Sequence, residues 1–296
     1  MASRLILSQN EQKNSYGSKI KLLSPAKINL YLNITGKYNK EFHAIESIFE
    51  RISLFDEISI QTTKDESIKF SCNNKILETK DNLCIRAAQL IKDKYKIPFG
   101  FNIKLKKKIP IGAGLGGGSS NAATTLIGIN SLLKLKLSKK QLYDLGSKLG
   151  SDINFFLSES SFAFISGRGE QVSPFKGKKL YHLVVWPGVS LSTAKVYKTY
   201  QGKLTKFLSN VNILVYAVGK GDIALIKNSI FNALERSALS LLGELSKIKE
   251  YFNEYSLDFR VTGSGSALYA VLDKKSFKGI KLNLPKKWTA IFVQTF

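Results

Sequence analysis

A glycine-rich segment constrains this chain more strongly than any other feature of its sequence. Residues 109–126 read IPIGAGLGGGSSNAATTL, with five glycines in the seven positions from Gly112 to Gly118. A strand-like run precedes the segment, and an apolar stripe of helical spacing follows it from Ala122 to Leu133. Glycines allow positive φ and close backbone approach, and the N–H groups at a helix start attract anions. The segment therefore predicts a phosphate-binding loop between a strand and a helix, with a flexible glycine hinge as the alternative.

Three other classes of phosphate-binding loop match this segment less well. A Walker loop ends in Gly-Lys-Ser or Gly-Lys-Thr, whereas this run ends in Gly-Ser-Ser at 118–120. A dinucleotide loop shares the GxGxxG spacing that starts at Gly112, but residues 135–139 carry no acid about 20 positions later, where a ribose ligand is expected. Protein-kinase loops share the spacing too, yet no HRD or DFG signature follows. The Walker class is excluded, and the other two are weak alternatives.

The composition is that of a globular chain from a reducing compartment. Of its 296 residues, 44% are hydrophobic and 23% charged, which suffices for one large domain or two smaller ones. No run approaches the roughly 18 to 20 apolar residues that cross a bilayer. Cys72 and Cys84 have no metal-ligand or CxxC spacing, which argues against structural zinc. We expect a cytoplasmic protein that makes no membrane contact.

The net charge of +23 is compatible with nucleic acid, anionic lipid or phosphorylated metabolites as partners. Only six of the 45 basic residues are arginine, the side chain that makes bidentate contacts to bases and phosphates. Lysine-rich background composition is therefore favoured over a surface that binds polyanions. A basic RNA-binding protein remains the alternative outside the enzymes.

Patterns along the chain predict two α/β units. Strand-like runs between Lys21 and Ile60 surround a possible helix at 44–52, and a helix at 83–95 precedes a strand at 100–109. Strands and a long helical stretch at 224–252 then form a separate α+β group. We expect the boundary near residue 180.

Seven segments, in order along the chain, together resemble the GHMP kinase superfamily and, within it, the 4-diphosphocytidyl-2-C-methyl-D-erythritol kinase family. The segments are 24–37, 43–58, 109–126, 149–157, 162–170, 186–197 and 261–271. Homoserine, galactose and mevalonate kinases share the glycine loop. The combination of PAKINLYL at 25–32 with PGVS at 187–190 is more specific.

This resemblance implies a two-domain α/β (α+β) fold, with an N-terminal domain like ribosomal protein S5 and a ferredoxin-like C-terminal domain. It implies ATP with Mg²⁺ and, as acceptor, the 2-hydroxyl of a cytidine-diphosphate-linked methylerythritol on the non-mevalonate route to isoprenoid precursors. Another GHMP small-molecule kinase is the alternative within the fold. We expect a monomer or weak homodimer without a nucleic-acid partner. The implied parts are a polar extension at 1–20, an ATP-binding domain at 21–180 and a C-terminal domain at 181–296.

Asp152 and Lys27 are the candidate catalytic residues. Asp152 stands just ahead of an apolar run, so its carboxylate could face a pocket, with a helix N-cap or turn aspartate as the alternative. Lys27 shares one face of a strand with Asn29, opposite an apolar face, and an ordinary solvated lysine is its alternative. By resemblance, Asp152 accepts the proton of the attacking hydroxyl. Lys27 then favours the charged carboxylate and stabilises the developing alkoxide.

The resemblance assigns ATP binding to the whole glycine loop. Ser119 and Ser120 are expected at the helix N-cap, where a hydroxyl caps the helix or binds Mg²⁺, and Ser120 is the metal candidate. The predicted ATP-binding residues are Pro110, Ile111, Gly112, Ala113, Gly114, Leu115, Gly116, Gly117, Gly118, Ser119 and Ser120.

The acceptor site is expected to hold cytosine by aromatic stacking and by hydrogen bonds to the base edge. By resemblance, Phe42 pairs with His43, and Tyr197 closes the stack. Without the resemblance to the family, Phe42 and Tyr197 would be assigned to the hydrophobic core. Two positions depart from the family: YNKEFH at 38–43 lacks the usual Asp-Gly, and Asn154 stands where proline or a small apolar residue is common. The other predicted acceptor residues are Asn29, Gly263, Ser264 and Gly265.

Overall fold

The computed structural model of the chain describes residues 6–10, 16–37, 43–201, 209–280 and 282–296. Within it the chain forms two compact units, each assembled from separated stretches. Unit 1 comprises Met1–Ala26, Leu54–Ile109 and Gly117–Glu159, and unit 2 comprises Lys27–Ser53, Pro110–Gly116 and Ser160–Phe296. The domain boundary expected near residue 180 stays a prediction.

Unit 1 is built on a sheet with the strand order β1-β2-β3-β5-β4. Strands β3 and β5 pair antiparallel, from Glu57 opposite Lys106 to Thr63 opposite Gly100, whereas β4 and β5 pair parallel. The long strands β2 and β3 continue into unit 2. The strands are β1 (Ile6–Asn10), β2 (Lys19–Lys37), β3 (His43–Thr63), β4 (Ile68–Cys72) and β5 (Gly100–Lys106).

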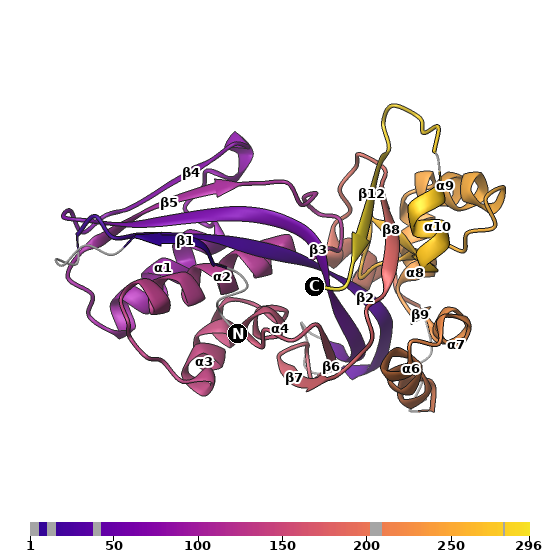
Figure 1. Cartoon of the computed structure of the whole chain (residues 1–296), viewed down its shortest axis with the longest axis horizontal. Helices are drawn as coiled ribbons and strands as arrows, with labels where there is room; N and C mark the ends of the chain where they lie inside the picture. Colours follow the sequence, from indigo (N-terminus) through magenta and orange to yellow (C-terminus); the bar gives the residue numbers. More distant parts are fainter. Residues whose placement is uncertain (1–5, 11–15, 38–42, 202–208, 281) are drawn as a thin grey trace. The chain divides into compact units, whose positions relative to one another are not determined.

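Helices cover one face of the unit 1 sheet (Figure 1). Helix α2 packs close to the sheet, because a Cβ atom on Gly128 would lie 2.7 Å from Ile60 Cδ1 on β3. Helix α1 begins after Asn82, whose side chain accepts a hydrogen bond from Cys84 N at 2.9 Å and caps the first turn. The elements are η2 (Lys75–Leu77), α1 (Leu83–Lys94), α2 (Gly117–Leu132), α3 (Lys139–Leu149) and α4 (Ile153–Leu157). The helix predicted at 83–95 is confirmed.

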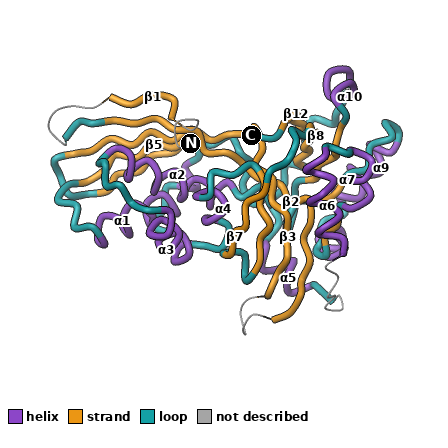
Figure 2. Tube along the Cα trace, turned by 60° about the horizontal axis from the view of Figure 1, so that its bottom comes forward, coloured by secondary structure: helices purple, strands orange, loops and turns teal. Residues whose placement is uncertain are grey.

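Unit 2 contains the rest of β2 and β3 together with a second sheet (Figure 2). Strand β3 pairs with β6, β6 pairs with β7, and the short β9 pairs parallel with β2. The second sheet is antiparallel, in the order β10-β11-β8-β12. The strands are β6 (Phe162–Ser166), β7 (Gln171–Phe175), β8 (Tyr181–Trp186), β9 (Phe231–Asn232), β10 (Arg260–Val261), β11 (Leu268–Leu272) and β12 (Thr289–Gln294).

The helices of unit 2 differ from the sequence prediction. The stretch 224–252, expected as one helical region, is interrupted by β9, because Phe231 and Asn232 pair with β2. Residues 44–52, expected as a possible helix, belong to β3, where pairing with β6 outweighs local helical spacing. The helices are α5 (Thr193–Thr199), α6 (Ser209–Lys220), α7 (Ile223–Ser229), α8 (Glu235–Leu241), α9 (Glu244–Asn253) and α10 (Lys274–Gly279).

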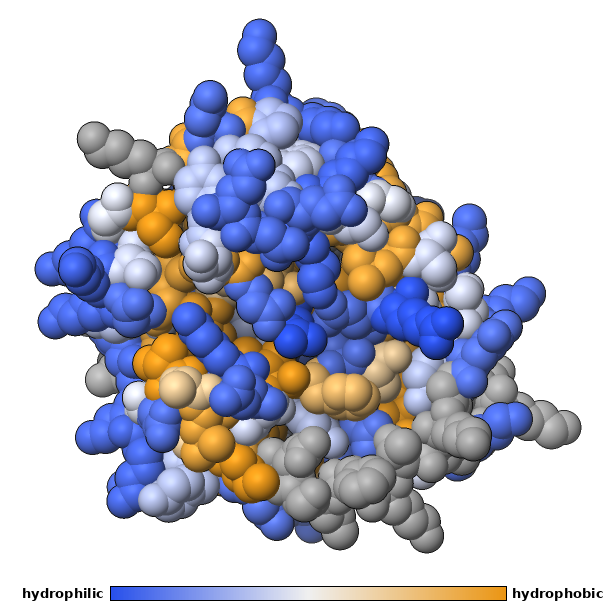
Figure 3. Space-filling view, turned by 90° about the vertical axis from the view of Figure 1, so that its right-hand side faces the viewer, coloured by the Kyte–Doolittle hydropathy of each residue, from blue (hydrophilic) through white to orange (hydrophobic). Residues whose placement is uncertain are grey.

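The surface is mostly hydrophilic on the face shown in Figure 3, with hydrophobic patches between the polar side chains. In unit 2 the exposed large hydrophobic residues include Tyr216 on α6, Val189 and Phe231. Among the described helices, none has the length and apolar composition that spanning a bilayer requires.

Candidate active site

The glycine loop has a backbone that other residues could not adopt without strain. Gly112, Gly114 and Gly116 have φ angles of +63°, +75° and +67°, in the left-handed region that favours glycine. A Cβ atom on Gly114 would lie 2.2 Å from the carbonyl oxygen of Thr262, so the loop and the turn at 262–265 meet backbone to backbone. Residues 110–116 therefore follow a defined backbone path within unit 2. The choice between a phosphate-binding loop and a glycine hinge stays a prediction.

Hydrogen bonds hold residues 111–115 of the loop from three sides within unit 2. Strand β2 contributes the bond from Lys27 N to Leu115 O at 3.0 Å, and the last turn contributes the bond from Ala267 N to Ala113 O at 3.0 Å. The PGVS segment contributes Ser190 Oγ to Ile111 O at 2.8 Å and Leu191 N to Gly112 O at 3.0 Å. Most carbonyl groups of this part of the loop are therefore engaged by other residues of unit 2.

Helix α2 begins at Gly117, so Ser119 and Ser120 lie inside its first turn and not at the expected N-cap. Ser120 is fully buried, and its Oγ lies 2.8 Å from Ser24 Oγ. A metal ion on Ser120 would have to displace this contact, and the metal assignment stays a prediction. No group of three or more His, Cys, Asp and Glu side chains gathers at a possible metal site within the described ranges.

Lys27 and Asn29 form a buried polar pair on β2. Lys27 is 4% exposed; its Nζ donates to Asn29 Oδ1 at 2.6 Å and lies 4.6 Å from the centre of the Phe49 ring. Both faces of β2 are buried here, so the alternative of a solvated lysine is wrong. The ammonium group is therefore held in a defined position.

Asn29 is itself fixed by hydrogen bonds along its backbone and side chain. Its Nδ2 donates to Ser47 Oγ at 3.0 Å, and its backbone N donates to Thr262 Oγ1 at 2.9 Å. The Tyr269 hydroxyl donates to the Asn29 carbonyl at 2.9 Å, and burial raises the pKa of Tyr269 well above its usual value, which keeps the donor protonated. These bonds orient the amide that receives Lys27.

The third glycine turn approaches the same pair. A Cβ atom on Gly263 would lie 3.2 Å from Asn29 Oδ1, 3.2 Å from Gly114 O and 3.4 Å from Lys27 Nζ. Asn232 supports the turn by donating from Nδ2 to Gly263 O at 2.8 Å. Unit 2 thus brings together four features that the sequence analysis singled out: the loop, Lys27, Asn29 and the turn at 263–265.

Asp152 belongs to unit 1 and lies at the N-cap position of α4. Its side chain makes no capping hydrogen bond to that helix, so the helix does not account for its carboxylate. The two phenylalanines that follow it, Phe155 and Phe156, are buried and anchor this segment as expected. Its catalytic role stays a prediction.

His43 and Tyr197 come together although 154 positions separate them in the sequence. Their rings stack at a centroid distance of 5.2 Å and an interplanar angle of 29°, between the first residue of β3 and helix α5. Both side chains are half-buried, and the pair offers an aromatic surface on which a planar base can stack. Phe42 and the altered turn at 38–42 lie outside the described residues.

Comparison with known proteins decides the family. The model of the GHMP kinases N terminal domain matches residues 82–160, and that of the GHMP kinases C terminal matches residues 214–290. A curated 4-diphosphocytidyl-2-C-methyl-D-erythritol kinase of Prochlorococcus marinus (strain MIT 9515) is 38% identical over 271 residues, which cover 86% of each chain. The chain belongs to the 4-diphosphocytidyl-2-C-methyl-D-erythritol kinase family. It is an ATP-dependent small-molecule kinase, as the sequence predicted.

Solved structures agree with this family. A 4-(cytidine 5'-diphospho)-2C-methyl-D-erythritol kinase aligns with a TM-score of 0.71 at 29% identity, over 85% of this chain and 89% of that one. A homoserine kinase from Cytophaga hutchinsonii aligns with a TM-score of 0.69 at 17% identity, over 97% and 96% of the two chains, and shows the fold alone. The predicted GHMP kinase fold is confirmed.

One departure from the family's usual residues is accommodated in unit 1. Asn154, 3% exposed on α4, donates from Nδ2 to Ser147 Oγ on α3 at 2.9 Å. A Cβ atom on Gly146 would lie 2.5 Å from Asn154 Oδ1, so the glycine makes room for the larger side chain. Asn154 therefore joins helices α3 and α4.

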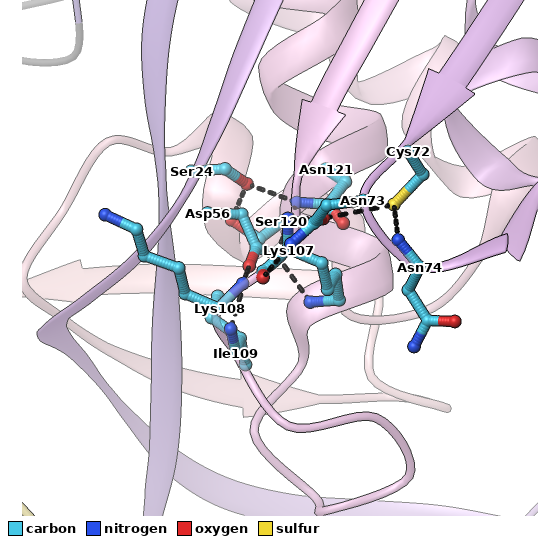
Figure 4. A network of polar contacts seen from close by, with 10 residues as sticks. All are labelled: Ser24, Asp56, Cys72, Asn73, Asn74, Lys107, Lys108, Ile109, Ser120 and Asn121. Atoms are coloured by element: carbon cyan, nitrogen blue, oxygen red, sulfur yellow. Dashed lines mark hydrogen bonds and ion pairs between the residues drawn. The ribbon is translucent and has the colours of Figure 1, made fainter.

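The sequence analysis missed a polar network beside the loop, centred on Asp56 of β3 (Figure 4). The signal was present, because Asp56 alternates with Leu54 and Ile58 on the buried face of the strand. A carboxylate on an apolar face requires partners. Spacing alone could not identify those partners, which lie 51 to 65 positions away.

Proposed function

We propose that this kinase transfers the γ-phosphoryl group of ATP to the 2-hydroxyl of 4-diphosphocytidyl-2-C-methyl-D-erythritol, in the non-mevalonate route to isoprenoid precursors. The observation that carries the proposal is the 38% identity, over 86% of the chain, to a curated relative of that name. The site geometry supports it, because the loop, Lys27 and the turn at 263–265 are neighbours in unit 2.

The loop is proposed to bind the phosphates of ATP through backbone N–H groups and the N-terminus of α2. Mg²⁺ enters as part of the substrate, bound to the triphosphate, where it neutralises phosphate charge. Phosphoryl transfer then needs alignment of the hydroxyl with the γ-phosphorus and stabilisation of the charge that spreads over the oxygens. The backbone N–H groups of the loop and the ammonium group of Lys27 are proposed to stabilise that negative charge.

Asp152 is proposed to accept the proton of the attacking hydroxyl. Removal of this proton as the oxygen–phosphorus bond forms avoids a cationic oxygen, and carboxylates serve as such bases in kinases. Lys27, fixed by Asn29, is proposed to stabilise the developing negative charge. Both roles follow from the match to family positions.

The cytidine end of the acceptor is proposed to bind at His43 and Tyr197. The stacked rings offer an aromatic surface for the base, and the imidazole offers nitrogen atoms for hydrogen bonds to its edge. Gly263, Ser264 and Gly265 are proposed to contact the part of the acceptor near the reacting phosphate. Cys84 is assigned no role in catalysis, because burial raises the pKa of its thiol to about 12, which keeps that thiol neutral.

A panel of acceptors tests this function. Purified protein, Mg²⁺ and ATP are incubated with 4-diphosphocytidyl-2-C-methyl-D-erythritol, homoserine, mevalonate or galactose, and ADP release and the phosphorylated product are measured. We expect rapid turnover of the cytidine compound alone, with the new phosphate on its 2-hydroxyl in the phosphorus NMR spectrum. Preferential turnover of another acceptor would establish a different GHMP kinase. A gel shift with RNA at physiological salt but no turnover of any acceptor would favour the RNA-binding alternative.

A further inference from the structure

Asp56 is a fully buried carboxylate whose hydrogen-bond capacity is used entirely by residues that flank the glycine loop (Figure 4). Its Oδ1 accepts from the backbone N–H groups of Lys108 at 2.7 Å and Ile109 at 2.8 Å. Its Oδ2 accepts from Lys107 Nζ at 2.5 Å and from Asn121 Nδ2 at 2.9 Å. All five residues belong to unit 1.

These four bonds join the two ends of the loop. Lys107, Lys108 and Ile109 are the last residues before the loop, which leaves unit 1 after Ile109. Asn121 lies in the first turns of α2, which begins where the chain returns at Gly117. A single carboxylate on β3 therefore fixes the entry and the exit of the loop relative to each other.

A second bridge reinforces the exit side. Asn121 uses its other amide hydrogen to donate to Ser24 Oγ on β2 at 2.9 Å, and the same Oγ lies 2.8 Å from Ser120 Oγ. Ser24 is fully buried, so its hydroxyl acts within the protein. The first turn of α2 is thus attached to β2 and, through Asp56, to β3.

Lys107 extends the network to the loop backbone. Its side chain is 8% exposed, and a Cβ atom on Gly117 would lie 2.7 Å from its Nζ. Asn73 holds the backbone of Lys107 from the other side, with Lys107 N donating to Asn73 Oδ1 at 2.7 Å. The buried ammonium group is consequently held against the first residue of α2.

Stability alone explains this arrangement poorly. Apolar residues of similar volume often stabilise a core as well as a buried ion pair does, because both charges lose their hydration. What a buried network supplies is a defined geometry, since each donor has one acceptor at one distance. The contacts of Asp56 fall on the two ends of one loop, where geometry determines how backbone N–H groups meet a phosphate.

We propose that Asp56 is a positioning residue for the nucleotide: it sets the separation of the two loop ends and thereby the alignment of the N–H groups that bind the phosphates of ATP. The inference rests on ATP binding at the loop and is independent of the identity of the acceptor. Asp56 makes no contact with substrate in this account and acts through the loop.

The test compares Asp56→Asn with Glu50→Gln. Asp56→Asn keeps one oxygen, which can still accept from the two backbone N–H groups. It replaces the other oxygen by an –NH₂ group, which cannot accept from Lys107 Nζ or Asn121 Nδ2, so both of these bonds are lost. Glu50 is the matched control: it is fully buried on the same strand, lies 2.9 Å from His182 Nε2, accepts from Thr295 Oγ1 at 2.6 Å, and belongs to unit 2. Both changes replace a buried carboxylate by an amide of the same size.

The readouts are the dissociation constant for ATP by titration calorimetry, KM for each substrate, kcat and the melting temperature. We expect Asp56→Asn to raise the ATP dissociation constant and the ATP KM about tenfold or more, because misplaced binding groups lose that much readily. Acceptor KM should stay within about twofold, since none of the residues proposed to bind the acceptor is among the hydrogen-bond partners of Asp56. Glu50→Gln lowers the melting temperature but leaves ATP affinity unchanged.

Ser24→Ala is a second variant that keeps the ion pair and removes only the bridge from β2 to Asn121 and Ser120. It should fold and raise the ATP dissociation constant a few-fold, in the direction of Asp56→Asn. Equal ATP affinities in Asp56→Asn and Glu50→Gln would overturn the proposal. If Asp56→Asn does not fold, an unchanged ATP affinity in Ser24→Ala would overturn it. Because ATP binding is measured without acceptor, a wrong acceptor assignment leaves this result intact.

Discussion

The two ends of the proposed active site differ in what forms them: backbone groups form the nucleotide end, and side chains form the acceptor end. At the nucleotide end, residues 110–118, the structure is backbone: three glycines with positive φ, and carbonyls bonded to β2, to the PGVS segment and to the last glycine turn. At the acceptor end, His43 and Tyr197, it is a pair of half-buried side chains on β3 and α5. A site formed by backbone groups loses its affinity when the backbone conformation changes. A site formed by side chains loses only the contribution of the side chain that is replaced.

This difference predicts separable effects of substitution. A change at the nucleotide end should affect ATP and spare the acceptor, and a change at the acceptor end should do the reverse. Lys27 and Asp152 are assigned to neither binding step, because their proposed roles concern the transferred proton and the developing charge. Substitutions there should reduce the rate of chemistry and spare both binding steps.

The largest effect is expected for Asp152→Asn. The amide keeps the size of the side chain but cannot accept the proton, so kcat should fall about 10²- to 10⁴-fold. Dissociation constants for ATP and for the cytidine compound, measured separately, should remain near those of the wild type. Asp144→Asn, at an exposed position on α3, is the control that should retain full activity. A kcat near the wild-type value would remove Asp152 from the mechanism.

The next effect is expected for Gly114→Ala at the nucleotide end. The backbone of Gly114 has a φ of +75°, which alanine rarely adopts, and the added Cβ would lie 2.2 Å from the Thr262 carbonyl oxygen. The backbone of the loop therefore has to move. We expect kcat/KM for ATP to fall about 10²-fold, since displacement by about 1 Å can cost that much. Acceptor affinity measured without ATP should fall less than ATP affinity, because the methyl group also approaches the backbone of Gly265 in the turn proposed to contact the acceptor.

Gly243→Ala is the control for this change, because a Cβ atom there would meet nothing within 4 Å. It should leave both affinities and the melting temperature unchanged. If Gly114→Ala binds ATP as tightly as Gly243→Ala does, the loop does not bind the phosphates.

Tyr197→Ala tests the acceptor end and should have a smaller effect. Loss of one aromatic surface from a stacked base costs about 1 to 3 kcal/mol, which raises the acceptor KM about 5- to 150-fold. ATP affinity should stay nearly constant. His43→Ala should change the same constant in the same direction. A loss of ATP affinity in place of acceptor affinity would contradict the assignment of the two ends.

The same difference explains what the sequence could and could not predict. The loop was predictable because its glycines are adjacent in sequence and each answers a local backbone requirement. His43 and Tyr197 could be paired only through the family resemblance, since 154 positions separate them and neither carries a local signal. The helix expected at 44–52 was wrong because pairing with β6, a contact between distant segments, decides the conformation there.

Buried polar groups were the second source of error. Lys27 was weighed as a solvated residue, but β2 is covered on both faces, and that coverage depends on segments more than 200 positions away such as Thr262 and Tyr269. Asp56 carried a visible signal, a charge on the apolar face of an alternating strand. Its partners lie in a lysine run and in a helix turn, and only the folded chain shows which of them it meets.

The most direct test of the acceptor assignment is the ratio of kcat/KM for the cytidine compound to that for its uridine counterpart. Cytosine presents an amino group where uracil presents a carbonyl oxygen, so a site that hydrogen-bonds this edge leaves a group unpaired with the wrong base. We expect the wild type to prefer the cytidine compound about 10²-fold or more. Equal turnover of the two compounds would contradict cytidine recognition and leave a small-molecule kinase of the GHMP fold with a different acceptor.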